Sequence, residues 1–153
     1  MLSPSFDDYP VGRVIETKAV TLTEADIIGF ARLYDPQIIH TDPAAAQAGP
    51  FGGLIASGFQ TVALGFRLFL DTGAMEGCSL GGPAMDNVRW LKPVRPNCQL
   101  RSRVTVLEAT PSRSKSDRGA IKWGFEIFAD DVLVCTGDIT SLLKRREARS
   151  LSP

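Results

Sequence analysis

An aspartate and a histidine, Asp35 and His40, lie five residues apart in a segment that Pro36 and Pro43 stiffen. A carboxylate and an imidazole held close together form an acid/base pair, because between them they can accept a proton from water and return one to carbon near neutral pH. The sequence has one histidine, so all imidazole chemistry must take place at His40, and a metal site built from several histidines is excluded. Spacing alone is weak evidence, because a single loop histidine is more often a structural hydrogen-bonding group.

Two glycines, Gly52 and Gly53, open the longest apolar stretch of the sequence, which runs from Pro50 to Asp71. We expect a long helix here that starts at the glycines, where the absence of side chains lets a ligand approach N–H groups that the first turn leaves unpaired. The helix dipole favours negative charge at this end. The two N–H groups are therefore candidate donors to an oxyanion that develops near the acid/base pair. The alternative is a glycine turn before a buried helix, with no site.

The same apolar stretch indicates the fold class. Its hydrophobic residues occupy nearly every direction of a helical wheel, so the helix must be wrapped by the rest of the chain. It is not a membrane span, because Gly58, Gln60 and Arg67 interrupt it and the apolar pieces are shorter than the roughly 20 residues that a bilayer requires. After Pro83 the hydrophobic period falls to two, which predicts strands at 86–91, 100–106, 121–127 and 132–143. The expected architecture is α+β, with a curved antiparallel sheet around a central apolar helix.

Shorter elements are expected before and between these. The sequence predicts a strand at 14–20, a helix from Thr23 to about Asp35 that ends before Pro36, a loop over 35–43 and a helical turn at 44–48. The polar segment 111–119 and the pair Asp130-Asp131 are predicted connections between antiparallel strands. We expect one domain over residues 1–143 and a charged, frayed tail over residues 144–153.

Composition limits the class of protein and of partner. Hydrophobic residues make up 44% and charged residues 22%, which is ordinary for a soluble globular protein. Lys+Arg and Asp+Glu both total 17, so no basic excess favours nucleic acid or an anionic membrane surface. Cys78, Cys98 and Cys135 are an odd number without metal-binding spacing, which favours reduced structural thiols. The first ten residues lack the features of a signal peptide, so a cytoplasmic location is expected.

Three blocks of the sequence resemble the MaoC-like dehydratases, the R-specific enoyl-CoA hydratase branch of the hot-dog superfamily. They are YDPQIIHTDP at 34–43 with Ala46, FGGLIASG at 51–58 and DNVRWLKPVRP at 86–96. The family pattern around the first block is Asp-x-Asn-Pro-aliphatic-His, so Gln37 stands where Asn is usual and Ile38 where Pro is usual. The resemblance covers most of the chain from about Thr21 to Leu143 and implies the hot-dog fold, in which a curved antiparallel sheet grips a long helix.

This resemblance implies a hydro-lyase of fatty acid metabolism that reversibly hydrates a trans-2-enoyl-CoA to a 3-hydroxyacyl-CoA. Asp35 and His40 would hold the water, one removing its proton while the other protonates Cα; which residue does which stays open. The N–H of Gly53, with Gly52 beside it, would bind the thioester carbonyl, and Gln37 would lie near the substrate. No metal or redox cofactor is implied, because the thioester itself makes the α-carbon acidic and CoA enters as part of the substrate.

The third block also places three cations, Arg89, Lys92 and Arg95, in close succession. They form either a solvated strand end or a contact for the phosphates of CoA. Two polar residues near the pair are given structural roles: Asp42 as the cap of the next turn, and Ser57 as a core-facing or backbone-bonded residue rather than a nucleophile.

Other functions on the same fold stay open. A thioesterase is disfavoured, because no Asp or Glu lies between Gly52 and Leu70. Ile38 at the position of the family proline favours an acyl-thioester binding module without turnover. An exposed sheet edge and an acyl tunnel that one small domain leaves unfinished predict a homodimer.

Overall fold

The structure is a computed structural model that describes residues 2–147. Within these residues the chain forms one sheet of six strands, four α-helices and a short 3-10 helix. In chain order they are η1 (Phe6–Asp8), β1 (Val14–Glu16), β2 (Val20–Leu22), α1 (Glu24–Tyr34), α2 (Ile38–Thr41), α3 (Pro43–Gln47), α4 (Gly58–Leu70), β3 (Ala84–Trp90), β4 (Cys98–Pro111), β5 (Arg118–Ala129) and β6 (Val132–Lys144).

The sheet is antiparallel throughout, with the strand order β1-β4-β5-β6-β3 and with β2 also paired to β4. The four strands predicted from the alternating pattern are confirmed, with ends shifted by a few residues. Asp130 and Asp131 form the β5–β6 turn with φ of 48° and 63°, the left-handed geometry that suits a two-residue hairpin. The single strand predicted at 14–20 is instead two short strands, which pair with successive parts of β4.

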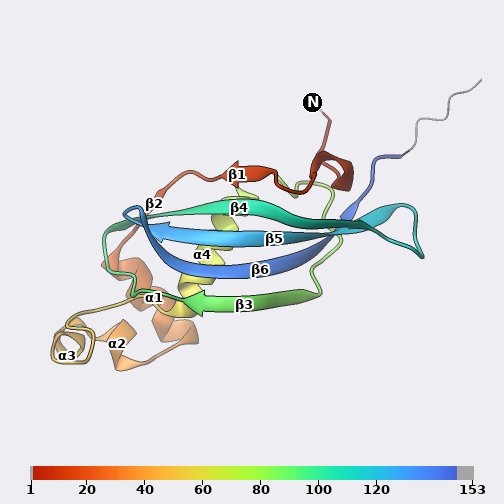
Figure 1. Ribbon diagram of the computed structural model, residues 1–153. Coiled ribbons are helices and arrows are strands. Elements are labelled where there is room, and N and C mark those ends of the chain that lie inside the picture. Colours follow the sequence, from red (N-terminus) through yellow and green to blue (C-terminus); the bar gives the residue numbers. More distant parts are fainter. Residues whose placement is uncertain (1, 148–153) are drawn as a thin grey trace, which may run out of the picture.

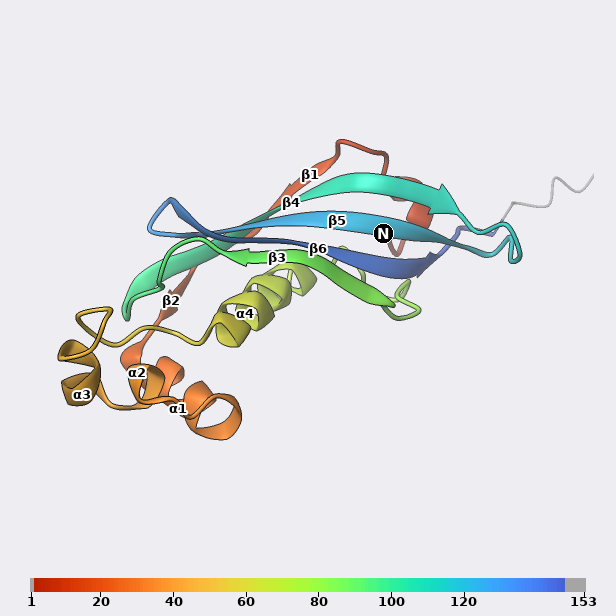
Figure 2. The ribbon, with the colours of Figure 1, turned by 60° about the horizontal axis from the view of Figure 1, so that its bottom comes forward.

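Helix α4 covers one face of this sheet, while α1, α2 and α3 gather at one end (Figures 1 and 2). Strand β5 shows why the sheet has an inner face, since every second residue from Gly119 to Ala129 is buried. The ring of Phe69 on α4 packs 4.9 Å from that of Trp123 and 5.4 Å from that of Phe125. The central helix gripped by an antiparallel sheet is therefore confirmed.

Two expectations about this helix are wrong. It begins at Gly58, after the cap residue Ser57, and not at the glycine pair, because Ile55 and Ala56 donate their N–H groups to the carbonyls of Ile39 in α2 and of Val94. It is also not wrapped on all sides. One chain buries only the side that faces the sheet and leaves four residues of the opposite side exposed, which are Phe59, Ala63, Arg67 and Leu70.

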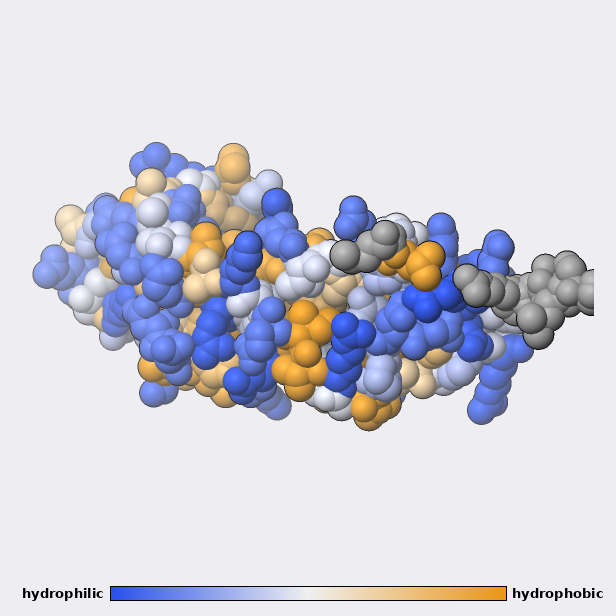
Figure 3. All heavy atoms as spheres, turned by 90° about the horizontal axis from the view of Figure 1, so that it is seen from above, coloured by the Kyte–Doolittle hydropathy of each residue, from blue (hydrophilic) through white to orange (hydrophobic). Residues whose placement is uncertain are grey.

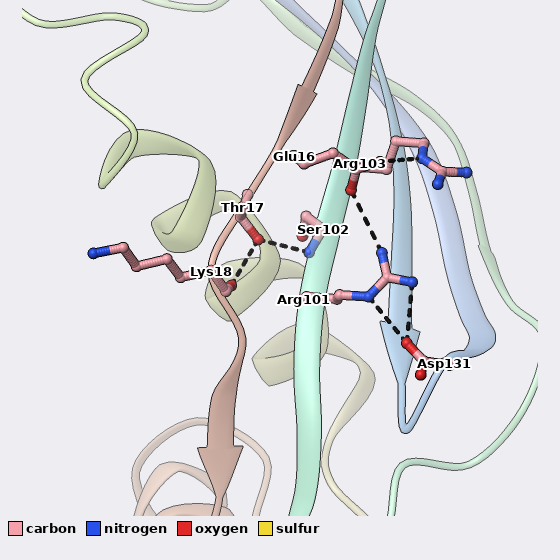
Figure 4. A network of polar contacts seen from close by, with 7 residues as sticks. All are labelled: Glu16, Thr17, Lys18, Arg101, Ser102, Arg103 and Asp131. Atoms are coloured by element: carbon pink, nitrogen blue, oxygen red, sulfur yellow. Dashed lines mark hydrogen bonds and ion pairs between the residues drawn. The ribbon is translucent and has the colours of Figure 1, made fainter.

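Charged side chains cover the sheet near β1 (Figure 4). Arg101 of β4 donates to Asp131 Oδ1 at 3.1 and 3.2 Å, and it also lies 3.5 Å from Glu16 of β1. Arg103 donates to the same Glu16 at 2.5 Å. Hydrophilic side chains also predominate on the face of the molecule seen from above (Figure 3). Of these charged residues only Glu16 lies on the edge strand β1, where a charge discourages pairing with another strand.

The two ends of the described chain meet. Arg145 lies 2.8 Å from Asp7, and Arg146 lies 2.7 Å from Asp8. The expected tail therefore starts later than residue 144, since Lys144 ends β6 and the next two residues pair with η1; residues 148–153 lie outside the described part. Within residues 2–147, no helix combines the length and the hydrophobicity that crossing a membrane would need.

Candidate active site

The segment that carries Asp35 and His40 is more regular than the predicted loop. Thr23 caps α1, accepting from the N–H of Asp26 while the Asp26 carboxylate accepts from the N–H of Thr23. Helix α1 ends at Tyr34, before Pro36, and the four residues of α2 follow. This short helix turns the chain back, so that His40 within it faces Asp35, which caps the C-terminus of α1. Ile38, at the position of the family proline, starts α2 and is 62% exposed.

The structure brings the predicted pair together. His40 Nε2 lies 3.3 Å from Asp35 Oδ2, and the histidine side chain is buried. The other ring nitrogen, Nδ1, is 2.7 Å from the carbonyl oxygen of Ile55. Because a carbonyl only accepts, Nδ1 is the donor in this contact, and Nε2 is the nitrogen that faces the carboxylate.

Two side chains hold the carboxylate of Asp35. Ser57 Oγ donates to Oδ2 at 2.7 Å, and Gln37 Nε2 donates to Oδ1 at 2.7 Å. The bond from Ser57, then that from Gln37, and to a smaller extent His40, lower the pKa of Asp35 below its ordinary value, while burial acts in the opposite direction. Asp35 is therefore ionised at neutral pH, with both oxygens held in place.

Ser57 is the functional residue whose role the sequence did not reveal. It was expected to face the core or bond the backbone, and it is indeed fully buried and accepts from the N–H of Phe59 as the cap of α4. Its second bond, to Asp35, joins residues 22 positions apart. A serine before a helix signals a cap, but no local signal marks a contact at that distance.

A cavity of about 420 Å³ opens beside the pair. Its walls come from α2, the segment before α4, the first turn of α4 and the end of β3. Apart from the polar groups near the pair and Lys92 they are mostly apolar, as in sites that bind small organic molecules. The lining residues are Asp35, Gln37, His40, Phe51, Ile55, Ala56, Gly58, Phe59, Thr61, Trp90, Leu91, Lys92, Pro93 and Val94.

The predicted glycine pair, Gly52 and Gly53, lies outside the lining of this cavity. The N–H of Gly52 donates to the carbonyl of Gly49 at 3.2 Å. The helix dipole expected at these glycines acts elsewhere, since α4 begins at Gly58. Gly58, the first residue of the helix, does line the cavity together with Asp35 and His40.

The three predicted cations separate in space. Lys92 lines the cavity, whereas Arg89 on β3 and Arg95 do not. Arg95 donates to the carbonyls of Gly53, at 3.2 Å, and of Phe51. Arg95 thus holds the glycine turn in place.

Metal-binding side chains do not cluster in the described part of the chain. Between residues 2 and 147, His, Cys, Asp and Glu side chains nowhere gather in threes with a geometry that could hold a metal ion.

Residues 7–122, which contain Asp35, His40 and Ser57, match the sequence model of the MaoC-like domain. The chain belongs to the MaoC-like domain family. Its sheet and central helix form the hot-dog fold that this family shares with the R-hydratases.

Individual MaoC-like relatives agree with this assignment. The uncharacterized protein YdeM of Bacillus subtilis is 34% identical over 140 residues, which cover 91% of this chain and 98% of that protein. The 3-hydroxyacyl-thioester dehydratase Z of Mycobacterium tuberculosis is 37% identical over 92 residues, covering 59% of this chain and 61% of that protein. The crystal structure of the MaoC-like dehydratase from Rhodospirillum rubrum superposes with a TM-score of 0.86 at 31% identity, covering 94% of this chain and 99% of that one.

Proposed function

We propose that this MaoC-like chain is a hydro-lyase that adds water to a trans-2-enoyl-CoA and, in reverse, removes it from a 3-hydroxyacyl-CoA. The observation that carries the proposal is the 3.3 Å approach of Asp35 Oδ2 and His40 Nε2 on the wall of a cavity. A relative named as a 3-hydroxyacyl-thioester dehydratase supports this class of reaction.

In the proposed reaction the pair acts as a unit on one water molecule. The water oxygen bonds to C3 of the enoyl group while one of its protons passes to the pair, and the pair returns a proton to Cα on the same face. The C=C bond is lost, new C–O and Cα–H bonds form, and the pair ends in its starting protonation state. The negative charge that develops on the thioester oxygen would be stabilised by the N–H of Gly58 and the dipole of α4 behind it.

The test removes each member of the pair. Asp35→Asn or His40→Ala should lower the hydration rate of crotonyl-CoA or a longer enoyl-CoA by about 10²-fold to 10⁴-fold, the usual contribution of a positioned acid or base. Absorbance of the enoyl-thioester band measures the rate, and circular dichroism checks the fold. Asp42→Asn is the matched control, because Asp42 caps α3 through the N–H of Ala45 and Asn caps equally well.

Two results would contradict the proposed hydratase function. Full activity in both pair variants would show that the chemistry lies elsewhere. The second result is that an acyl-CoA raises the melting temperature of the wild type, while every enoyl-CoA stays unchanged over hours. The chain would then be an acyl-thioester binding module.

Lys92 is the proposed contact for a phosphate of CoA, because it is the cation on the cavity wall. Lys92→Ala should raise KM for an enoyl-CoA several-fold more than for the matching enoyl-pantetheine, which lacks the nucleotide phosphates. Arg89→Ala is the control, since Arg89 is also an exposed cation and lies off the cavity. Equal effects of Lys92→Ala on both substrates would remove this role.

The proposal also includes a homodimer. Strand β3 is an edge of the sheet, and all but one of its residues are exposed. Large apolar side chains gather there and on the uncovered side of α4, namely Phe59, Leu70, Met85, Trp90 and Leu91. A second copy placed against this edge would pair its free backbone groups and bury these side chains.

A further inference from the structure

Arg95 carries a guanidinium group that the proposed reaction does not use. It lies in the segment between β3 and β4, one residue after Val94, which lines the cavity of the acid/base pair. Its Nη1 donates to the carbonyl of Gly53 at 3.2 Å, and its Nη2 donates to the carbonyl of Phe51. Arg95 thus joins segments that lie 42 and 44 positions apart in the sequence.

Phe51 is the residue through which this contact reaches the active site. It lines the same cavity as Asp35 and His40. Both Phe51 and Arg95 lie outside α4 and β3, the two elements that the proposed dimer would cover. An aromatic ring in the wall of a small cavity helps to orient a bound substrate for reaction. The position of Phe51 therefore affects how an enoyl group lies against the pair.

Residues 50–53, the turn that carries Phe51, have few other connections. In the part of the chain that the structure describes, the hydrogen bonds that reach this turn from a distant segment both come from Arg95. The N–H of Gly52 donates locally, to the carbonyl of Gly49. Gly52 has a φ of 64°, in a region that glycine enters freely, so the turn can adopt other conformations. Without Arg95, the turn would lose its connection to the segment after β3.

The shape of the guanidinium group suits this contact. Its terminal nitrogens form a rigid planar fork, so they can donate to two carbonyl oxygens at the same time. The group also lies close against Gly53, where a Cβ atom would come within 3.3 Å of Nη1. A lysine would keep the charge but has a single terminal nitrogen. Both the fork of Arg95 and the small residue beside it therefore favour a main-chain contact over a contact with a phosphate.

We infer that Arg95 is a positioning residue for the proposed hydratase function, on which this inference rests. It holds the turn so that Phe51 stays in the wall of the cavity, and Phe51 in turn orients the bound enoyl group. His40 is held separately, because the carbonyl of Ile55 accepts from its Nδ1 and the N–H of Ile55 donates to Ile39. Arg95 therefore acts on substrate binding and not on the protonation of the pair.

The test is a double-mutant cycle between Arg95 and Phe51. Arg95→Ala and Phe51→Ala should each raise KM for crotonyl-CoA by about tenfold, the lower end of what a hydrophobic pocket discriminates, with a smaller change in kcat. The double variant should bind no more weakly than Phe51→Ala alone, because Arg95 acts through that ring. Arg95→Lys should restore only part of the loss. Arg13→Ala is the matched control and should leave KM unchanged, since Arg13 is also exposed and also donates to a main-chain carbonyl, that of Asp8.

Three results would overturn the inference. The first is an additive effect in the cycle, which would show that Arg95 does not act through Phe51. The second is a KM that rises more for crotonyl-CoA than for crotonyl-pantetheine in Arg95→Ala, which would show that Arg95 binds a phosphate. The third is a shift of the acid limb of kcat/KM in Arg95→Ala, which would show that Arg95 acts on the acid/base pair.

Hydrogen exchange of backbone amides gives a readout that does not require turnover. In Arg95→Ala the amides of residues 51–54 should exchange faster, while those of β5 keep their wild-type rates. If the wild type hydrates crotonyl-CoA but Arg95→Ala changes neither these rates nor KM, the inference is wrong and the proposed function stands. If no enoyl-CoA reacts, the proposed function fails. Unchanged exchange would then overturn the role of Arg95 as well, whereas faster exchange would support its hold on the turn.

Discussion

Asp35 is surrounded by hydrogen-bond donors, and this determines its chemistry. Ser57 and Gln37 each bond one oxygen, and both bonds favour the ionised form. The carboxylate thus keeps its charge to lower pH than an ordinary aspartate does. Ser57 acts on the reaction only through Asp35, so it is a positioning residue.

Removing Ser57 should move the acid limb of the pH profile. In Ser57→Ala the carboxylate loses the bond that contributes most to its lowered pKa, so its pKa rises towards the ordinary value. The acid limb of kcat/KM should then shift to higher pH, and kcat at neutral pH should fall. Gln37→Ala should shift the limb in the same direction by less, because its bond is the second contribution. An unchanged profile in Ser57→Ala would mean that Asp35 is not the group that titrates in the reaction.

At the scale of elements, one glycine determines how closely α4 approaches the sheet. Ser102 Oγ donates to the carbonyl of Gly65 at 3.1 Å. A Cβ atom at Gly65 would lie 2.4 Å from Ile127 Cδ1 and 3.0 Å from Ser102 Oγ, closer than packing allows. This close approach seats Phe69 among the aromatic rings of β5, and it positions the first turn of the same helix at the active site.

Replacing glycine by alanine should have opposite effects on the free energy of unfolding in helices α4 and α1. Gly65→Ala should lower the free energy of unfolding, because overpacking costs about 1–3 kcal/mol and outweighs the better helix propensity of alanine, about 1 kcal/mol. Gly29→Ala, in an exposed position of α1 with open space around it, should raise it by up to about 1 kcal/mol. Chemical denaturation measures both, and a stabilised Gly65→Ala variant would contradict the packing described.

The whole molecule has two unlike edges. Near β1 the sheet carries the network of Glu16, Arg101, Arg103 and Asp131, whereas β3 presents an open strand with apolar neighbours. Light scattering at micromolar concentration should therefore give a molar mass of twice the 16.5 kDa of one chain. The mass of a single chain would contradict the dimer and would leave the exposed side of α4 without an explanation.

The sequence by itself determined the parts of this protein that depend on neighbouring residues. Alternation of period two identified the long strands, because successive side chains of a strand point to opposite faces. Thr23 and Pro36 marked the ends of α1, since caps and prolines act within one turn. The short stiff segment that holds Asp35 and His40, together with the resemblance of three sequence blocks to the MaoC-like dehydratases, pointed to the acid/base pair.

Only the tertiary structure decided what depends on distant residues. Helix α4 starts at Gly58 because Ile55 and Ala56 bond to Ile39 and Val94, which no local pattern shows. The bond from Ser57 to Asp35 and the meeting of Phe59 with Trp90 likewise join separate elements. Such contacts follow from how the sheet, the helix and the loops pack, and their partners are chosen by shape and hydrogen bonding in space. Residue patterns along the chain therefore indicated the chemistry of the site, whereas tertiary packing determined which residues line its cavity.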